Sequence, residues 1–181
     1  ARGGITAFAV EKNTPGFYAG TIERKMGLRG SHTSELIFDN CRVPVKNVIG
    51  GESMVGEGFK TAMRVLDKGR LTMGACALGS AQKLLDLCVA YAKERVQFGK
   101  PIARFQSVQN MLADMATEIY AARQMLYHAA WSRDQGKKVI KEASMAKLFC
   151  TEMACRVADN AVQIFGGMGY MKDFPVERFY R

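Results

Sequence analysis

The sequence predicts an α+β chain: a short antiparallel β segment followed by an up-and-down antiparallel bundle of long helices. Two observations support this fold class. Short apolar runs separated by glycine and proline fill the chain up to about Gly58, and long helical repeats of apolar residues fill the remainder. The connections between those repeats are short, and helices joined by short loops pack as antiparallel neighbours. We place the boundary between the two parts after residue 56, which gives segments 1–56 and 57–181.

The first part contains three strand-like runs. Ile5–Val10 is apolar and stops at Asn13–Gly16, where proline and glycine favour a turn. Thr21–Arg24 is a weaker run. Ser34–Phe38 alternates apolar and polar residues, as a half-buried strand does. Pro44 cannot donate to a strand ladder, so we expect an edge or a loop after it.

The second part contains three helical repeats, at about residues 59–94, 107–135 and 140–165. In the second repeat, apolar residues recur at i, i+3, i+4 and i+7, which is the pattern of a helix with one buried face. The first repeat is interrupted by glycines, each of which costs about 1 kcal/mol relative to alanine in a helix. We expect these glycines to permit the close packing of a neighbour or a ligand; they are Gly69, Gly74 and Gly79.

Composition excludes several classes of protein. Five cysteines without a C-x-x-C pair, and two histidines far apart, argue against a disulfide scaffold or a metal site. We expect Cys76, Cys88 and Cys150 to pack as small core residues, because their neighbours are apolar and helical. No apolar run reaches the roughly 20 residues of a membrane helix. The net charge of +9 is scattered without aromatic interleaving. This pattern favours either a fragment that has lost its acidic partner segment or a site for an anionic small molecule over nucleic acid.

Asp67–Arg70 is the first candidate functional stretch. Asp67 and Arg70 are three residues apart and can face each other on a helix. One interpretation is a local ion pair on a solvated face. The other is a ligand site, in which Gly69 leaves room and Arg70 meets an anionic or carbonyl-rich group.

Arg95–Pro101 is the second such stretch. It is either a helix stop, with Gly99 as the cap, or a ligand site. In the second interpretation Arg95 and Gln97 donate to phosphate oxygens and Phe98 lies against a flat ring. Phe105-Gln106 follows after a short turn and is expected to join the same site.

Gln163–Tyr170 is rich in glycine and superficially resembles a phosphate loop. A dinucleotide fingerprint follows a strand and opens a helix, whereas Gly166 and Gly167 are predicted to close a helix as caps. The interpretations that remain are capping alone and backbone approached closely by another group. The following stretch, Asp173–Arg178, is predicted to start a further helix.

In this order and spacing, these stretches resemble the acyl-CoA dehydrogenase family over essentially the whole chain. The Arg95 and Gln163 stretches are the most specific. In that family a helical domain is followed by a middle β-domain and a C-terminal four-helix bundle, so the resemblance makes segment 1–56 the end of the middle domain and 57–181 most of the bundle. The stretches that carry the resemblance are Gly27–Thr33, Phe38–Pro44, Leu66–Arg70, Arg95–Lys100, Gln163–Tyr170 and Phe174–Arg178.

The resemblance also implies roles for individual residues. Asp67, Lys68, Gly69 and Arg70 match the stretch that lines the acyl-CoA site. The stretch Gln163–Gly167 matches a helix end that approaches the FAD of a partner subunit. The assembly in that family is usually a homotetramer. The residues that match FAD contacts are Arg95, Val96, Gln97, Phe98, Phe105, Gln106, Gln163, Ile164, Phe165, Gly166 and Gly167.

The implied reaction is α,β-dehydrogenation of an acyl-CoA thioester. A glutamate removes the α-proton, FAD takes the β-hydrogen as hydride, and the electrons pass to an electron-transferring flavoprotein. In members of the family this glutamate lies either shortly after the equivalent of Phe174–Arg181 or at the position of Gly69. We expect the chain to be a fragment without its base. We therefore assign no catalytic residue and no metal ligand, and we expect no turnover from the chain alone.

Two alternatives remain open at this stage. One is a truncated paralogue that serves as a non-catalytic assembly subunit. The other is an acyl-CoA oxidase or a flavin monooxygenase on the same fold. The unpaired cysteines fit a reducing compartment, either bacterial cytoplasm or mitochondrial matrix.

Overall fold

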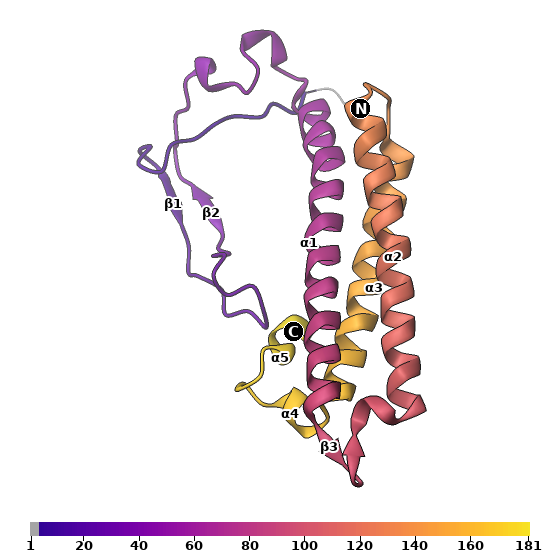
Figure 1. The fold of residues 1–181 in the computed structure, drawn as a ribbon. Helices are drawn as coiled ribbons and strands as arrows, with labels where there is room; N and C mark the ends of the chain where they lie inside the picture. Colours follow the sequence, from indigo (N-terminus) through magenta and orange to yellow (C-terminus); the bar gives the residue numbers. More distant parts are fainter. Residues whose placement is uncertain (1–3) are drawn as a thin grey trace. The chain divides into compact units, whose positions relative to one another are not determined.

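The computed structural model describes residues 4–181. The chain forms two compact units, one ending at Leu66 and the other spanning Asp67–Arg181. Figure 1 shows the predicted fold class, a short antiparallel strand pair followed by a helical bundle. The division between the units falls within helix α1 (Gly58–Glu94). The predicted domain boundary between residues 56 and 57 stays a prediction about the complete protein.

The first unit is built on one antiparallel strand pair. Strand β1 (Phe17–Ala19) pairs with β2 (Leu36–Phe38), and Phe17 lies opposite Phe38. The two rings stack with centroids 4.9 Å apart. Gly16 precedes β1 with a φ of 79°, and a Cβ there would lie 2.1 Å from the carbonyl oxygen of Asp39, so the turn requires glycine.

The strand predictions were only partly right. Ser34–Phe38 contains β2, but Ile5–Val10 makes isolated bridges only, and Thr21–Arg24 forms no strand. Only one backbone hydrogen bond links the weak run to its neighbour, from Glu23 N to the Thr33 carbonyl, so no ladder develops. Strand β1 was missed because Gly16 and Gly20 bracket three residues, too few to show alternation.

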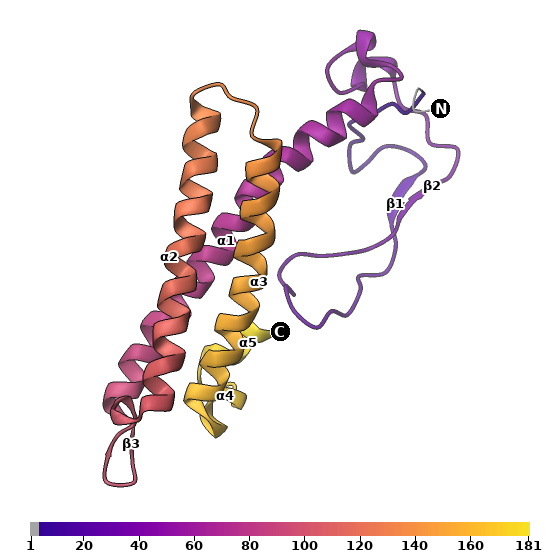
Figure 2. The same cartoon turned by 90° about the vertical axis from the view of Figure 1, so that its right-hand side faces the viewer.

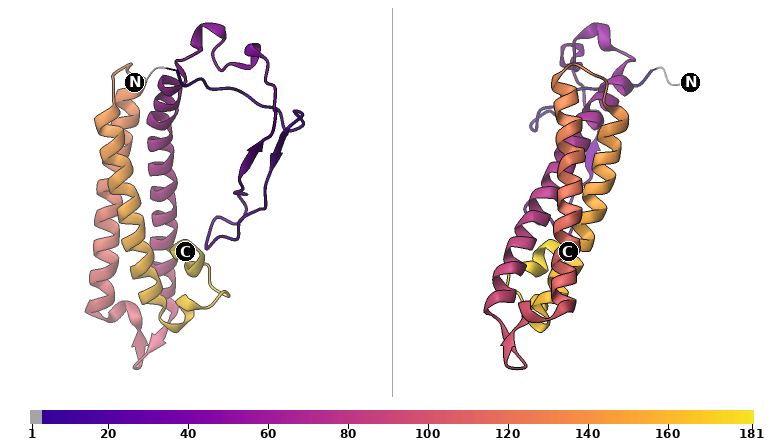
Figure 3. Two further views of the ribbon diagram at one scale, coloured as in Figure 1. Left: turned by 180° about the vertical axis from the view of Figure 1, so that it is seen from behind. Right: turned by 45° about the vertical axis from the view of Figure 1, so that its right-hand side comes forward.

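The three long helices agree with the prediction to within one residue at each end. Besides α1 they are α2 (Gln106–Asp134) and α3 (Ile140–Phe165). Short helices α4 (Gly167–Tyr170) and α5 (Val176–Tyr180) follow, and α5 confirms the predicted helix start. Figure 1 shows α2 running opposite to α1 and α3, and Figures 2 and 3 show α2 and α3 side by side along their lengths.

One apolar face of each long helix forms the core of the second unit. Small residues at the contacts, such as Ala81, Ala122 and Ala146, let the helix backbones approach closely, while leucine, isoleucine and methionine fill the space between them. Burial of these faces is the main favourable term in holding the bundle together. The largest fully buried side chains are Leu84, Met115, Ile119, Met153, Val157, Val176, Cys88 and Cys150.

The three glycines of α1 differ in what surrounds them. Gly74 is buried, and a Cβ there would lie 3.1 Å from Leu126 Cδ1 and 3.7 Å from Cys150 Sγ. The predicted close packing of a neighbour is therefore confirmed at Gly74. At Gly69 and Gly79 no described atom outside the local helix lies within 4 Å of such a Cβ, so no neighbour packs there.

The cysteine predictions held for two of three residues. Cys88 and Cys150 are buried, and burial raises the pKa of the Cys88 thiol to about 12 and that of Cys150 above its ordinary value. The Cys150 thiol lies 3.8 Å from the Ala122 carbonyl oxygen, to which it donates. Cys76 is exposed, contrary to the prediction, because its apolar sequence neighbours Ala75 and Ala77 do not share its face of the helix.

Residues 4–181 contain neither a candidate membrane span nor a candidate metal cluster. None of the helices there combines the length and apolarity needed to cross a bilayer. In the same part of the chain, no three side chains among His, Cys, Asp and Glu gather as a metal site would require.

The substitution Gly74→Leu tests the packing of α1. We expect it to lower the free energy of unfolding by about 1–3 kcal/mol, because the new side chain must displace Leu126 from a close-packed contact. The matched control is Gly79→Leu on the same helix, which should be neutral or stabilising by up to about 1 kcal/mol. Chemical denaturation of the complete gene product measures both. Equal destabilisation by the two substitutions would contradict the packing described here.

Candidate functional site

A tight hairpin follows the end of α1. Strands β3 (Val96–Gln97) and β4 (Lys100–Pro101) pair across Phe98 and Gly99, which have φ values of 52° and 79°. Positive φ at both central residues is the signature of a type I′ turn. The expected helix cap at Gly99 is therefore wrong: α1 ends at Glu94, and Gly99 is the second residue of the hairpin turn. The sequence Phe-Gly hid this turn, because asparagine or aspartate usually precedes the glycine.

Phe98 is exposed at a conformational cost. Its side chain is 91% exposed, and a non-glycine residue in the left-handed region costs about 1–2 kcal/mol. Its ring meets the Phe105 ring edge-on, with the two centroids 6.1 Å apart. Lys100 Nζ lies 4.5 Å from the centroid of the Phe105 ring. A strained residue that presents an apolar ring to the outside is a candidate for ligand contact.

A second turn closes α3. Gly166 caps the helix with φ 58° and ψ −137°, a conformation that side chains disfavour. The expectation that Gly167 is also a cap is wrong, since Gly167 is the first residue of α4. A helix precedes these glycines, so the dinucleotide fingerprint stays excluded. Gly169 is required by packing, because a Cβ there would lie 2.6 Å from the Val162 carbonyl oxygen, whereas nothing described lies within 4 Å of a Cβ at Gly167.

The hairpin and the second turn border one groove with a volume of about 320 Å³. Six of the predicted FAD residues line it: Arg95, Gln97, Ile164, Phe165, Gly166 and Gly167. Val96, Phe98, Phe105, Gln106 and Gln163 do not line it. The residues that the sequence interpretation missed are Tyr91, Ile102 and Met168.

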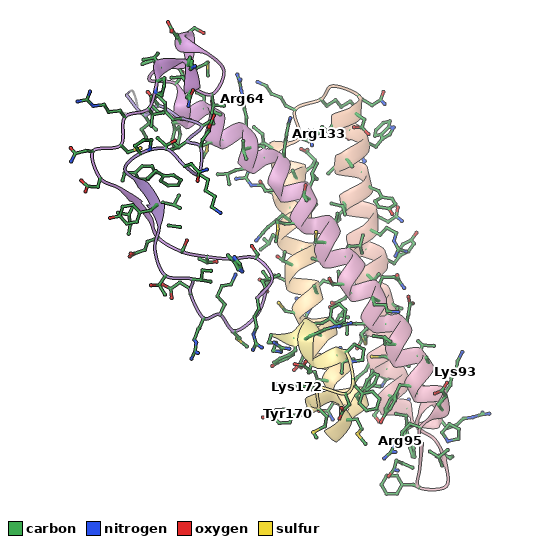
Figure 4. The ribbon with its side chains drawn as sticks, turned by 90° about the vertical axis from the view of Figure 1, so that its left-hand side faces the viewer. Arg64, Lys93, Arg95, Arg133, Tyr170 and Lys172 are labelled. Atoms are coloured by element: carbon green, nitrogen blue, oxygen red, sulfur yellow. The ribbon has the colours of Figure 1, made fainter. Side chains whose placement is uncertain are left out.

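Arg95 is the cationic group of the groove. No described carboxylate lies within ion-pair distance of its guanidinium, whereas Arg70, Arg156 and Arg181 are all paired. Figure 4 shows Arg95 at the hairpin end of the bundle, where Lys93, Tyr170 and Lys172 also lie. An exposed, unpaired guanidinium can bind an anionic oxygen in a bidentate arrangement.

Asp67–Arg70 lies elsewhere. The guanidinium of Arg70 donates to the Asp67 carboxylate, and both side chains are about one third exposed, at 34% and 35%. This pair agrees with the local ion-pair interpretation. The space beside Gly69 is open in the described structure, and none of the four residues lines the groove. Their substrate role stays a prediction.

Comparison with known proteins identifies the family. The model of the family domain described as "Acyl-CoA dehydrogenase, C-terminal domain" matches residues 56–181. The chain belongs to the acyl-CoA dehydrogenase family. It is 56% identical to an acyl-CoA dehydrogenase of Bacillus subtilis, over 99% of this chain and 47% of that protein.

Solved structures agree with this assignment. Butyryl-CoA dehydrogenase from Megasphaera elsdenii is 47% identical with a TM-score of 0.93, over 99% of this chain and 46% of that one. The FAD complex of PigA is 35% identical with a TM-score of 0.88, again over 99% and 46%. The chain thus spans about half the length of the relatives that it matches.

Proposed function

We propose that the complete protein is a flavin-dependent acyl-CoA dehydrogenase and that the groove between the hairpin and the α3–α4 turn binds part of its FAD. One observation carries this proposal: the unpaired guanidinium of Arg95 and the open backbone of Gly166 and Gly167 border the same groove.

The groove and the hairpin that borders it fit a flavin dinucleotide in three respects. The pyrophosphate is anionic, and Arg95 offers it charge-assisted hydrogen bonds. Gly167 keeps no side chain although the fold leaves room for one, so a ligand can approach the backbone there. Phe98 does not line the groove, but at the hairpin turn it presents an exposed ring that can stack on a flat ring system. The FAD complex of PigA supports the same assignment by relationship.

The remaining predicted FAD contacts belong to this proposal as well. Val96, Phe105, Gln106 and Gln163 flank the groove in sequence and would extend the contact surface. We further propose that the flavin served by Gln163–Gly167 is held mainly by a partner subunit of a homotetramer. The electron acceptor proposed for the reduced enzyme is an electron-transferring flavoprotein.

In this mechanism the chain's own residues bind and orient the cofactor and the acyl-CoA. FAD bound there would supply the acceptor for the hydride that leaves the β-carbon of the acyl-CoA. Arg95 and the glycine turn would fix the position of the cofactor, and Asp67–Arg70 would line the acyl-CoA site. No catalytic base is assigned within these residues, because the position that is acidic in some relatives is Gly69 here.

Flavin reduction tests the proposed activity. We expect the complete gene product to be yellow and to lose its visible flavin absorbance when an acyl-CoA is added without oxygen, because hydride reaches the flavin. Thioesters of graded chain length would identify the substrate. Rapid return of the colour when oxygen is admitted would indicate an oxidase or monooxygenase instead. A protein that binds no flavin, or is not bleached by any acyl-CoA, would support the assembly-subunit alternative.

The substitution Arg95→Ala tests the groove. We expect it to weaken FAD binding by about 10- to 150-fold, since a hydrogen bond to a charged group contributes about 1.5–3 kcal/mol. Titration of the flavin-free protein with FAD measures this affinity. The control is Arg133→Ala, which removes the same charge from the end of α2, at the opposite end of the bundle in Figure 4. Equal affinities of the two variants would place the flavin elsewhere.

The substitution Gly69→Leu tests the substrate site. The open space at Gly69 should accept the leucine without loss of stability, but the side chain would occupy room proposed for the acyl-CoA. We expect KM for the acyl-CoA to rise about tenfold or more, by analogy with misplaced methylenes in binding pockets. Gly79→Leu is the matched control, at an equally open glycine two to three turns further along α1. If both variants retain the wild-type KM, Asp67–Arg70 has only its ion-pair role.

A further inference from the structure

Three aromatic rings from separate elements meet at the groove, and two of them line it. Tyr91 of α1 stacks on Phe165 of α3, with centroids 4.0 Å apart and planes inclined by 11°. Phe174, in the segment before α5, meets both rings edge-on. Its centroid lies 6.1 Å from that of Tyr91 and 5.7 Å from that of Phe165. Phe165 is only 5% exposed. Edge-on contacts such as those of Phe174 are among the geometries that aromatic pairs prefer.

The stack joins the two sides of the groove. Arg95 lies one helical turn after Tyr91, and its backbone N–H donates to the Tyr91 carbonyl oxygen at 2.8 Å. Phe165 directly precedes the Gly166 turn, and Tyr91 and Phe165 both line the groove. The ring contact therefore connects the Arg95 side of the groove to the glycine side.

The contribution of Tyr91 lies in its ring. Its hydroxyl has no hydrogen-bond partner among the described residues, whereas its ring contacts two others. A phenylalanine at this position would keep the stack, and a leucine would remove it. These two substitutions separate a packing role of the ring from a direct contact between the hydroxyl and a ligand.

We propose that Tyr91 is a positioning residue for the cofactor: its ring, stacked on Phe165, holds the guanidinium of Arg95 at the distance from the Gly166–Gly167 turn that the ligand's phosphates require. This inference rests on the proposed function of the groove. It adds a residue that does not belong to the predicted binding set and that acts through Arg95.

Titration of the flavin-free complete gene product with FAD tests this proposal. We expect Tyr91→Leu to weaken binding about 2- to 13-fold, which corresponds to the contribution of an aromatic pair, and Tyr91→Phe to restore nearly the wild-type affinity. The visible circular dichroism of the bound flavin should change in the leucine variant and not in the phenylalanine variant. In an Arg95→Ala background, Tyr91→Leu should add less than its effect in the wild type, because the group that it positions is gone.

A matched control separates positioning from a general loss of stability. Phe149 is an aromatic residue of α3 that packs against the core without lining the groove. Phe149→Leu should lower the unfolding midpoint and leave FAD affinity unchanged. If it weakens FAD binding as much as Tyr91→Leu does, or if the effects of Tyr91→Leu and Arg95→Ala are fully additive, the positioning role is overturned.

The remaining outcomes are also decisive. If Tyr91→Phe loses as much affinity as Tyr91→Leu, the hydroxyl contacts the ligand and the ring is not the acting group. If every variant binds FAD as the wild type does, the proposal for Tyr91 fails while the proposed function stands. If the wild-type protein itself binds no FAD, the proposed function fails and the inference falls with it.

Discussion

Burial of one apolar face on each long helix is the constraint on which the second unit depends. Where α1, α2 and α3 meet, many residues are alanine or glycine, and a Cβ at Gly74 would lie only 3.1 Å from Leu126 Cδ1. Close-packed interiors transmit displacement, so the positions of the helix ends follow from the packing between them. The groove residues lie on those ends, at Arg95 after α1 and at Gly166 after α3. The candidate site is in this sense a product of the core, although among its lining residues only Ile164 and Phe165 belong to the buried core cluster.

The sequence predicted the helices well because their signal is periodic and local. Helix bounds depend on apolar spacing and on glycine at Gly166, and both can be recognised without a partner segment. The strands were predicted poorly because a strand is defined by its ladder: β1 has three residues, and its partner lies at Leu36–Phe38. The hairpin at Phe98 was missed for a different reason, since its first turn residue is one that the turn type does not favour. Resemblance to a family indicated that Arg95–Lys100 matters, but not that it forms a hairpin.

The distinction between local sequence signals and contacts between distant segments applies to the site as well. Six predicted residues came together in the groove, because the motifs that contain them follow the ends of α1 and α3, which lie at the same end of the bundle in Figure 1. Tyr91 was missed although it lies only four residues before Arg95, whose backbone N–H donates to the Tyr91 carbonyl oxygen. Its partner Phe165 is distant in sequence, and only the fold shows that the two rings stack. By contrast, Asp67–Arg70 forms the simple ion pair that its spacing predicts, and the structure adds only that Gly69 faces open space.

The buried thiol of Cys88 makes the stability of the bundle depend on pH in the alkaline range. In the unfolded chain the thiol ionises near its ordinary pKa of 9.0, whereas burial raises the pKa in the folded state to about 12. Below pH 9 both states keep the proton, so Cys88 gives stability no dependence on pH. Between pH 9 and 12 only the unfolded chain releases it, and the folded state loses stability as the pH rises. The same protonation protects the core from oxidation, because the thiolate is the form that oxidants attack.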